Sequence, residues 1–391
     1  MIGPMPRVLL LVPTVTYRAP DFVAAARALG VDLVVGTDDA AGLAADGRLV
    51  TIPLADPDAA TDTIEAIDRK IGVDAVVAVD DGGSLAAARA GERLGFPHNP
   101  PDAVAATRDK AEMRRRLARA EVPQPRFAST GADVGYPCVV KPTGLSGSRG
   151  VIRCDTPEAE HAARARIAAF WSGPVIVEQY VPGVEVAVEG LLRAGDLELL
   201  ATFDKPDPLV GPYFEETLYV TPSRLPVEQL RAVERATARA ASALGLTEGP
   251  VHAELRIDGE RLHVIEVAAR SIGGLCARTL RFGVGVSLEE LVLRHACSMP
   301  LDGIAREQVA AGVMMLPIPR SGTLAAVHGR EHALAVPLVE GLELTIPVGR
   351  PVVALPEGDR YLGFLFARGP TSEVVETALR EATSRLGIVV K

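Results

Sequence analysis

Several features that would place this chain in other protein classes are missing from its sequence. Its 391 residues carry 41 basic and 50 acidic side chains, a net charge of −9, without a long block of either sign. Nucleic-acid and anionic-membrane binders depend on a basic surface, so this balance argues against both. No apolar run approaches the roughly eighteen residues of a membrane helix, and the run at 8–12 is too short for a signal-peptide core. We therefore expect a soluble, cytoplasmic protein.

Cysteine is scarce, and the common nucleotide and nucleophile motifs are absent. The four cysteines are scattered without Cys-x-x-Cys spacing, which is typical of reduced thiols in a cytosolic protein. The chain has no Walker A sequence, and no G-x-G-x-x-G follows its first predicted strand. It also has no Ser-His-Asp or Cys-His pattern. With 48% hydrophobic residues the chain can bury a large core, and its length predicts two or three domains.

Strand and helix patterns alternate through the first hundred residues. The predicted elements, in chain order, are 8–12, 22–29, 31–35, 61–71, 75–79 and 85–94. Three of these are apolar β-branched runs, separated by segments of helical periodicity. This alternation predicts a small doubly wound domain with a parallel sheet and helices on its faces.

The remainder of the chain predicts two further parts. A linker at 96–101 precedes a helix at 107–119, and further helices are predicted at 228–244 and, behind a Ser287–Glu290 capping box, at 288–295. Strand patterns dominate after residue 301. The predicted domains are therefore an N-terminal α/β domain at 1–100, a central module at 101–300 with a lid at about 125–178, and a C-terminal α+β subdomain at 301–391. The basic run at 114–116 is interpreted as a solvated helix face.

The segment 137–151, PCVVKPTGLSGSRGV, is the most informative one. A buried-type strand ends at Lys141, and a loop rich in glycine and serine follows it, with Ser146, Gly147, Ser148 and Gly150. Glycines let backbone N–H groups turn toward an anion, and an adjacent lysine adds positive charge. The loop therefore suggests a polyphosphate ligand. A flexible surface loop is the alternative when the segment is considered alone.

Acidic residues further along the chain extend this pattern. Glu254 and Glu266 both interrupt apolar strands, where unpaired carboxylates are costly. The Asp258–Gly259 turn between them predicts a hairpin that brings the two onto neighbouring strands. Two converging carboxylates can hold Mg²⁺ between the β- and γ-phosphates of a nucleotide.

The order of these features resembles the ATP-grasp superfamily and, within it, the L-amino acid ligases that make dipeptides. The features are Lys110, Lys141 with its loop, the segment Glu178 to Glu185, and the two hairpin acids with Arg270 behind them. The match covers roughly residues 100–300, preceded by an α/β domain in the usual place. The resemblance implies an ATP-grasp fold, ATP and Mg²⁺ as cofactors, with Mn²⁺ as a substitute, and small carboxylate and amine substrates.

Roles for the nucleotide-binding residues follow from this resemblance. Lys110 and Lys141 are implied to bind the α- and β-phosphates from two subdomains, while the loop at 144–150 closes over them. The other implied nucleotide contacts are Glu178 with the adenine amino group, the backbone of Tyr180 and Val181 with the ring edge, and Glu185 with the ribose hydroxyls. Lys205 begins a Pro-rich loop and has two readings, a contact to a phosphate or substrate acid, or a loop lysine without function.

The resemblance also implies the metal ligands and the reaction. Glu254 and Glu266 would ligate Mg²⁺, and Arg270 would lie near the transferred phosphoryl group and the substrate carboxylate. Many superfamily members carry Asn where this chain has Ala268, which leaves a second metal in doubt, although the dipeptide-ligase branch is similar here. His252 is interpreted as a core residue close to the metal site.

The implied reaction forms an acyl phosphate from ATP and a carboxylate, and an amine then displaces phosphate to give an amide. A ligase for another small carboxylate, or a nucleotide-binding regulatory protein without turnover, is the alternative. A bicarbonate-activating carboxylase is disfavoured because the lid is short and the sequence has no Met-Lys-Met biotin site. A homodimer is a fair expectation for an enzyme of this size.

Overall fold

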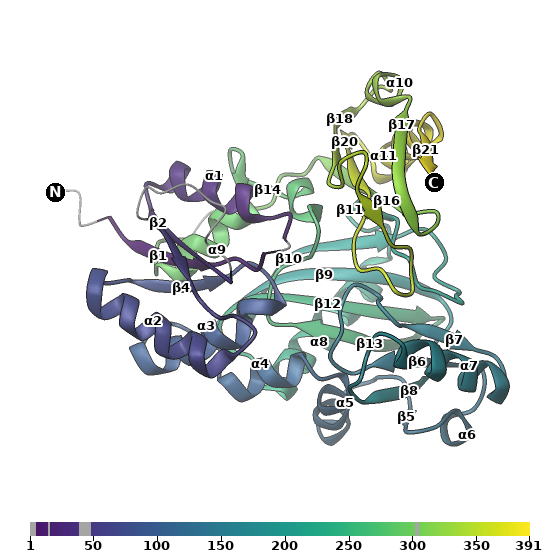
Figure 1. Ribbon diagram of the computed structural model, residues 1–391, viewed down its shortest axis with the longest axis horizontal. Helices are drawn as coiled ribbons and strands as arrows, with labels where there is room; N and C mark the ends of the chain where they lie inside the picture. Colours follow the sequence, from purple (N-terminus) through teal and green to yellow (C-terminus); the bar gives the residue numbers. More distant parts are fainter. Residues whose placement is uncertain (1–4, 15, 39–47, 302–304) are drawn as a thin grey trace.

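A computed structural model describes residues 5–14, 16–38, 48–301 and 305–391 of the chain. Its main β-structure is a four-stranded N-terminal sheet, a four-stranded sheet in the predicted lid, an eight-stranded central sheet and a three-stranded C-terminal sheet (Figure 1). Within these ranges no helix combines the length and the apolar character that crossing a bilayer requires.

The N-terminal sheet is parallel, with the strand order β3-β2-β1-β4, as the alternating pattern predicts. Its elements are β1 (Arg7–Leu11), α1 (Ala19–Leu29), β2 (Asp32–Thr37), β3 (Leu49–Thr51), α2 (Pro57–Ile71), β4 (Ala75–Ala78) and α3 (Asp81–Leu94). Successive side chains of β1 enter two different cores. Val8 and Leu10 pack with α1, whereas Leu9 and Leu11 pack with α2 and α3. This explains why the strand is an uninterrupted apolar run.

One helix of the N-terminal domain comes from far along the chain. The capped helix α9 (Leu288–Ala296) packs beside α1 and against β4, and it contributes Val292 and Leu293 to their shared core. Its capping box forms as predicted, between the Ser287 and Glu290 side chains and each other's backbone N–H groups. The helical layer of the N-terminal domain therefore includes one helix from outside the predicted range 1–100. A return of the chain after residue 280 completes the layer.

The lid region folds into a small antiparallel sheet of order β5-β8-β6-β7 with helices packed on it. Its elements are β5 (Phe127–Ala128), α6 (Gly131–Val134), β6 (Cys138–Pro142), β7 (Ile152–Cys154), α7 (Pro157–Ala168) and β8 (Val175–Gln179). Strand β6 is buried along its whole length and ends beside the glycine-rich loop, as predicted. All four cysteines of the chain are free, as expected, and three of them are buried.

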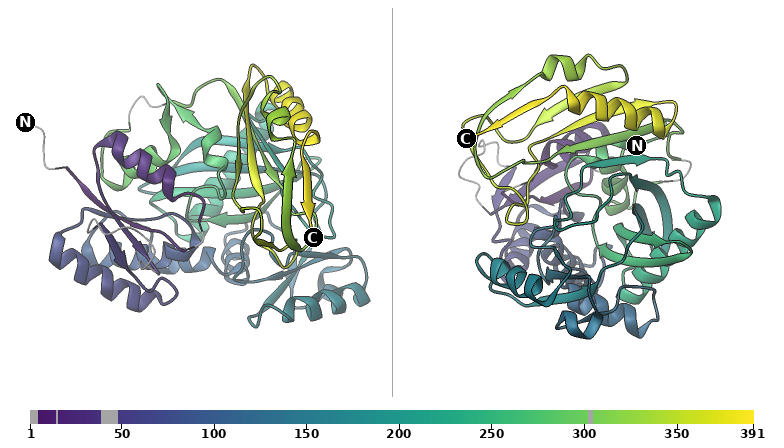
Figure 2. Two further views of the ribbon diagram at one scale, coloured as in Figure 1. Left: turned by 45° about the horizontal axis from the view of Figure 1, so that its top comes forward. Right: turned by 90° about the vertical axis from the view of Figure 1, so that its right-hand side faces the viewer.

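The central sheet crosses the predicted boundary near residue 300. Its order is β13-β12-β9-β10-β11-β16-β20-β18, so strands from the central and C-terminal regions share one hydrogen-bonded surface. Its strands are β9 (Val184–Arg193), β10 (Asp196–Lys205), β11 (Leu218–Thr221), β12 (Gly249–Asp258), β13 (Arg261–Ala268), β16 (Ala310–Leu316), β18 (Val339–Leu344) and β20 (Gly363–Gly369). Figure 2 shows the C-terminal strands beside the central ones.

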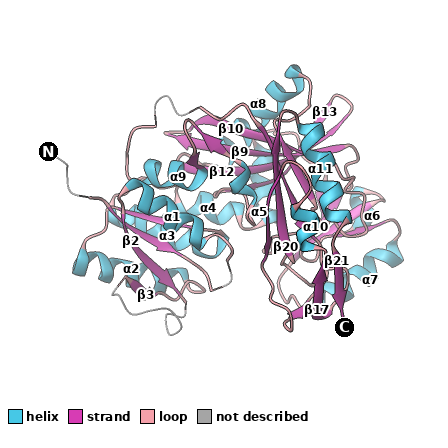
Figure 3. Cartoon of the chain, turned by 90° about the horizontal axis from the view of Figure 1, so that it is seen from above, coloured by secondary structure: helices cyan, strands magenta, loops and turns pink. Residues whose placement is uncertain are grey.

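Helices cover this sheet at both ends. The long helix α8 (Val227–Leu244), close to its predicted bounds, packs with α4 (Pro101–Thr107) and α5 (Lys110–Arg119) on the strands β9, β12 and β13. Helix α11 (Ser372–Ser384) packs on β16 and β20, as seen from above in Figure 3. The remaining elements are β14 (Arg281–Phe282), β15 (Val286–Ser287), β17 (Gly322–His328), α10 (Arg330–Leu334), β19 (Pro351–Val352), β21 (Gly387–Val390) and a 3₁₀ turn at Cys276–Thr279.

The helix predicted at 107–119 is wrong at its start, because the chain forms two helices there. Helix α4 ends at Thr107, and α5 begins at Lys110 behind Asp109, whose carboxylate accepts hydrogen bonds from the backbone N–H groups of Ala111 and Glu112. An aspartate in this position satisfies donors that the first helical turn leaves free. The break places Lys110 in the first turn of α5, rather than within a longer helix.

A close backbone approach leads into β9 and gives a test of the fold. Gly183 has φ +97°, and a Cβ atom there would lie 2.0 Å from the carbonyl oxygen of Ile257. We expect Gly183→Ala to lower the free energy of unfolding by about 3 kcal/mol through clash and backbone strain. Gly259 also has positive φ, +64°, but has open space around its Cα. The control Gly259→Ala should cost only about 1 kcal/mol, as measured by denaturant unfolding. Equal losses for both variants would contradict the steric argument.

Candidate active site

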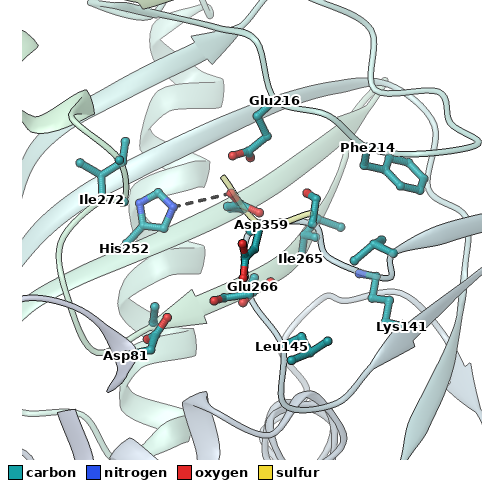
Figure 4. A pocket seen from close by; sticks show the side chains of 18 of the residues that line it. Asp81, Lys141, Leu145, Phe214, Glu216, His252, Ile265, Glu266, Ile272 and Asp359 are labelled. Atoms are coloured by element: carbon teal, nitrogen blue, oxygen red, sulfur yellow. Dashed lines mark ion pairs between the residues drawn. The ribbon is translucent and has the colours of Figure 1, made fainter. Parts of the chain in front are cut away.

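Most of the predicted site residues line one cavity of about 430 Å³. The N-terminal domain, the lid, the central sheet and residues 359–361 of the C-terminal region all contribute to its wall. Figure 4 shows Lys141 and Leu145 at one side of this space, Glu216 and His252 at another, and Glu266 between them. The predicted residues on the wall are Lys110, Lys141, Ser146, Gly147, Ser148, Glu178, Tyr180, Val181, Glu185, Glu254, Glu266 and Arg270.

Lys110 connects the glycine-rich loop with the hairpin that carries the two predicted metal ligands. Its ammonium group donates to the carbonyl of Leu145 at 2.7 Å and lies 3.3 Å from a carboxylate oxygen of Glu266. Its backbone N–H donates to the carbonyl of Thr143, at the start of the same loop. Both the backbone N–H and the side-chain ammonium of Lys110 therefore bind the loop.

Lys141 and Glu178 form a buried charge cluster with an arginine that the sequence analysis misassigned. Glu178 is 1% exposed, and its oxygens lie 2.7 Å from Lys141 and 2.7 and 3.1 Å from the guanidinium of Arg114. Burial alone would raise the pKa of Glu178, but the charges of Arg114 and Lys141 outweigh it and lower this pKa to about 2. The carboxylate is thus ionised, with partners for both oxygens.

The interpretation of the basic run 114–116 as a solvated face is wrong for its first member. Arg114 is 1% exposed and also donates to the backbone carbonyls of Val264 and Ile265. Arg115 stands on the exposed side of the helix and pairs with Glu112. The spacing contained the signal, because Arg114 follows Lys110 by four residues and so shares its helix face.

Tyr180 and Val181 follow β8, and their backbone, which is expected to contact adenine, already makes hydrogen bonds within the protein. The backbone N–H of Tyr180 donates to the carbonyl of Pro137, and the carbonyl of Val181 accepts from Arg256. The guanidinium of Arg256 also binds Glu185 at 2.6 Å, and it lies 5.6 Å from the centre of the Tyr180 ring. Arg256, which the sequence analysis did not single out, therefore organises both the predicted adenine edge and the predicted ribose acid.

Lys205 lies at the centre of three carboxylates, beneath the cavity wall rather than on it. Its ammonium contacts Glu185 at 2.7 Å and Glu254 at 2.8 Å, and it also binds Glu216. Burial would lower the pKa of Lys205, but the three acids raise it well above its usual value. The ammonium of Lys205 thus has three protein carboxylates as partners, and its expected contact to a phosphate or substrate acid stays a prediction. Glu216, at the end of the Pro-rich loop, was not assigned from sequence, because only the folded chain brings it beside β10 and β12.

The β12–β13 hairpin forms as predicted and places Glu254 directly opposite Glu266 in the strand register. The two carboxylates supply hard oxygen donors, which is the chemistry that Mg²⁺ requires, and lysines 205 and 110 lie 2.8 and 3.3 Å from them. The residues present therefore fit a divalent metal. Oxygen atoms of Glu185, Glu216 and Glu254 also lie within 4.8 Å of one another, around Lys205.

His252 is buried, as expected, but its contacts are with acids rather than with an apolar core. Its Nδ1 lies 2.5 Å from Glu189, and its Nε2 lies 3.6 Å from Glu254. Burial would lower the pKa of His252, yet the two carboxylates raise it to about 9. Glu189 uses its other oxygen to accept the backbone N–H of Ile272. This chain of contacts fixes Glu254 against the segment that follows Arg270.

Arg270 is held by an acid of the N-terminal domain. Its Nε lies 2.9 Å from Asp81, the first residue of α3. Burial would lower the pKa of Arg270, but the charge of Asp81 raises it. Asp81 was absent from the sequence-based site, since only the folded chain brings the start of α3 beside the segment that follows β13.

The glycine-rich loop is only partly on the cavity wall. Ser146, Gly147 and Ser148 line it, whereas Gly150 does not. Gly150 has φ +71° and donates its N–H to the carbonyl of Pro356 at 2.8 Å, in a distant part of the chain. Gly150 therefore anchors the loop to the C-terminal region, and its expected contact with the nucleotide stays a prediction.

Comparisons with known families agree with this architecture. The chain matches family models for an ATP-grasp domain at residues 134–279, an ATP-grasp N-terminal domain at 23–98 and an L-amino acid ligase C-terminal domain at 314–391. Together the three models match parts of the N-terminal domain, the lid and central sheet, and the C-terminal region. The predicted resemblance to ATP-grasp proteins is confirmed.

Among individual relatives and solved structures, the chain is similar to ligases that act on amino acids. A crystal structure of an L-amino acid ligase from Bacillus licheniformis superposes with a TM-score of 0.83 at 26% identity, covering 99% of each chain. An uncharacterised protein of Sinorhizobium fredii is 28% identical over 75% of this chain and 63% of its own length. The alanine–anticapsin ligase of Bacillus subtilis is 28% identical over 54% of this chain. The aligned part spans only 51% of that ligase. The predicted likeness to amino acid ligases is confirmed.

The Glu178 cluster generates a pH-dependent test of stability. Because the folded-state pKa of Glu178 is depressed, its contribution is present above its unfolded-state value near 4.5 and is lost as pH falls toward 2. We expect Glu178→Gln to cost about 3 kcal/mol of unfolding free energy at pH 7, since Arg114 and Lys141 lose their shared counter-charge. The difference from wild type should shrink steadily between pH 4.5 and 2. A difference that stays constant over this range, in denaturant unfolding, would contradict the assigned ion cluster.

Proposed function

Because this chain has an ATP-grasp fold and matches ATP-grasp family models over three regions, we propose that it is an ATP- and Mg²⁺-dependent ligase that joins a carboxylate to an amine through an acyl phosphate. Its substrates would be amino acids or close analogues. One observation carries the proposal: two lysines from different subdomains, a glycine-rich loop, opposed hairpin carboxylates and Arg270 line a single cavity. The similarity to an L-amino acid ligase over the full chain supports it further.

We propose that the lysines and the loop hold the triphosphate. Lys110 and Lys141 come from α5 and β6, so they approach an anion from two sides and can neutralise separate phosphates. Phosphoryl transfer depends mainly on positioning and charge neutralisation, which these groups supply without a protein nucleophile. The contacts of Glu178 favour a role in orienting Lys141 over the expected contact with adenine, because both of its oxygens are engaged.

Glu254 and Glu266 are the residues proposed to hold the metal. A bound Mg²⁺ would supply positive charge that neutralises the phosphates. The surrounding residues support this role by orienting the two carboxylates. Lys205 and His252 fix the orientation of Glu254, and Lys110 does the same for Glu266. Ala268 lies on the cavity wall and offers no side-chain oxygen to a second ion.

Arg270 is proposed to bind the carboxylate as it becomes an acyl phosphate. In the first step a carboxylate oxygen attacks the terminal phosphorus, and the bond to the bridging oxygen of ADP breaks. In the second step the amine nitrogen attacks the acyl carbon, inorganic phosphate leaves and one proton is lost. Asp81, in the N-terminal domain, holds the guanidinium of Arg270 in position for this reaction. A fixed cation at a developing negative charge is effective because it needs no reorganisation.

The decisive experiment measures ADP and phosphate release from ATP and Mg²⁺ across pairs of amino acids, with mass spectrometry of the products. We expect release that depends on two substrates and a product whose mass is their sum minus water. Release with one acid alone would indicate acyl phosphate formation without its amine partner. No release with any pair, together with normal nucleotide binding, would contradict amino acids as the substrates and leave two alternatives, a ligase for another small carboxylate and a nucleotide-binding protein without turnover. The expected homodimer and cytoplasmic location stay predictions.

Removal of one proposed metal ligand tests the site itself. We expect Glu266→Gln to abolish turnover at limiting Mg²⁺, at least a hundredfold, while the melting temperature stays near that of wild type, because the amide weakens both metal binding and charge neutralisation. Glu260, in the turn of the same hairpin and exposed, provides the matched control Glu260→Gln. Initial rates over a Mg²⁺ titration measure the effect. A wild-type rate for Glu266→Gln would remove this residue from the metal site.

A further inference from the structure

The C-terminal region reaches the lid through one turn, residues 354–361, which we call the latch turn. Its carbonyl at Pro356 accepts the N–H of Gly150, and its carbonyl at Glu357 accepts the Nε of Arg149 at 2.9 Å. Arg149 and Gly150 close the glycine-rich loop. These two bonds join the loop to a segment about two hundred residues away in the sequence.

A second contact joins the latch turn to the helix of the lid. Arg166 on α7 makes a two-pronged ion pair with Glu357, with distances of 2.5 and 3.1 Å. The same guanidinium donates to the hydroxyl of Tyr213 and lies 5.2 Å from the centre of its ring. A bidentate pair fixes orientation as well as distance, so α7 is held in one position relative to the turn.

The other end of the latch turn reaches the cavity. Asp359, Arg360 and Tyr361 line it. Tyr361 donates its backbone N–H to the hydroxyl of Tyr17 in the N-terminal domain at 3.3 Å, and its own hydroxyl lies 3.5 Å from Glu216. The turn is thus in contact with the lid, the N-terminal domain and the acids around Lys205.

The backbone of the latch turn is closely packed around Gly358. A Cβ atom on Gly358 would lie 2.0 Å from the carbonyl oxygen of Val353, so only glycine fits there. The N–H of Gly358 donates to the carbonyl of Ala354 at 2.9 Å. Glu357 is consequently presented to Arg166 by backbone geometry rather than by a flexible loop.

From these contacts we infer that the latch turn holds the lid closed over the cavity, with Glu357 as the positioning residue. Its catalytic consequence, which rests on the proposed function, is the exclusion of water from the acyl phosphate. When the lid opens early, water attacks the acyl carbon, phosphate leaves, and the carboxylate is regenerated without an amide. The latch therefore determines how many ATP molecules are spent per bond formed.

Trypsin cleavage after Arg149 tests the closed position without any requirement for activity. This bond is held against the latch turn, and its cleavage rate follows the population of open lid when reclosing is fast. We expect Glu357→Gln and Arg166→Gln each to raise the rate about three- to fivefold in the full chain, as loss of a partly exposed ion pair should. The double variant should show no further rise beyond that of Arg166→Gln, because the side chain of Glu357 acts through its contact with Arg166.

The matched control is a second partly exposed ion pair, Arg93–Asp62 at 2.8 Å, which joins α3 to α2 in the N-terminal domain. Asp62→Asn should leave the cleavage rate after Arg149 unchanged. Equal rates in wild type and both latch variants would overturn the inference, and so would an equal rise in the control. Melting temperatures measured on the same samples separate lid opening from global unfolding.

A second measurement tests the consequence for coupling. Once an amide-forming substrate pair is known, we expect Glu357→Gln to raise the ratio of ADP to amide at least twofold above that of wild type. Faster cleavage with an unchanged ratio would overturn the assignment of water exclusion to the latch. If wild type forms no amide with any pair, the proposed function fails, while the cleavage experiment still decides whether the latch exists.

Discussion

A carboxylate that is almost completely removed from water lies at the point where the subdomains meet. Glu178 is on the last strand of the lid sheet, Lys141 is on the neighbouring strand, and Arg114 reaches them from a helix packed on the central sheet. An ionised group at this depth is tolerated only with close partners of opposite charge. Arg114 also bonds two carbonyls of β13, so the same cluster ties the lid to the hairpin of the proposed metal ligands.

The same principle of paired charges is repeated across the cavity. Lys110 faces Glu266, Lys205 faces Glu254, and Arg270 faces Asp81, each within 3.3 Å. Lys141 is likewise paired with Glu178, so each of the three cations proposed to contact phosphate or substrate, Lys110, Lys141 and Arg270, has a protein counter-ion that positions it. Fixed pairs of this kind reduce the reorganisation that binding an anion would otherwise demand, which is the condition for strong electrostatic stabilisation. Because each pair joins two different elements, the geometry of the site depends on correct docking of the domains.

What could be predicted from sequence was determined by local patterns. The parallel N-terminal sheet, the strand before the glycine-rich loop, the β12–β13 hairpin and the capping box all follow from short-range rules of periodicity and turn chemistry. Glu254 and Glu266 were identified because a hairpin fixes which residues oppose each other. In contrast, Asp81, Arg256 and Glu216 reach the cavity only through tertiary docking, and no local pattern marks them. Arg114 is an intermediate case, since helical spacing carried its signal and the neighbouring arginines obscured it.

The position of the C-terminal region explains a difficulty in dividing this chain into independent parts. Its strands β16, β18 and β20 extend the sheet that carries the proposed metal ligands, and its turn at 354–361 contacts the lid. The helix α9 likewise returns to the N-terminal layer. Because several regions of the chain line the cavity, removing one region would also displace residues that the others contribute. The three matched family regions are therefore sequence units, whereas the cavity is a property of the whole chain, because Arg270 needs Asp81, and Lys110 and Glu266 need each other.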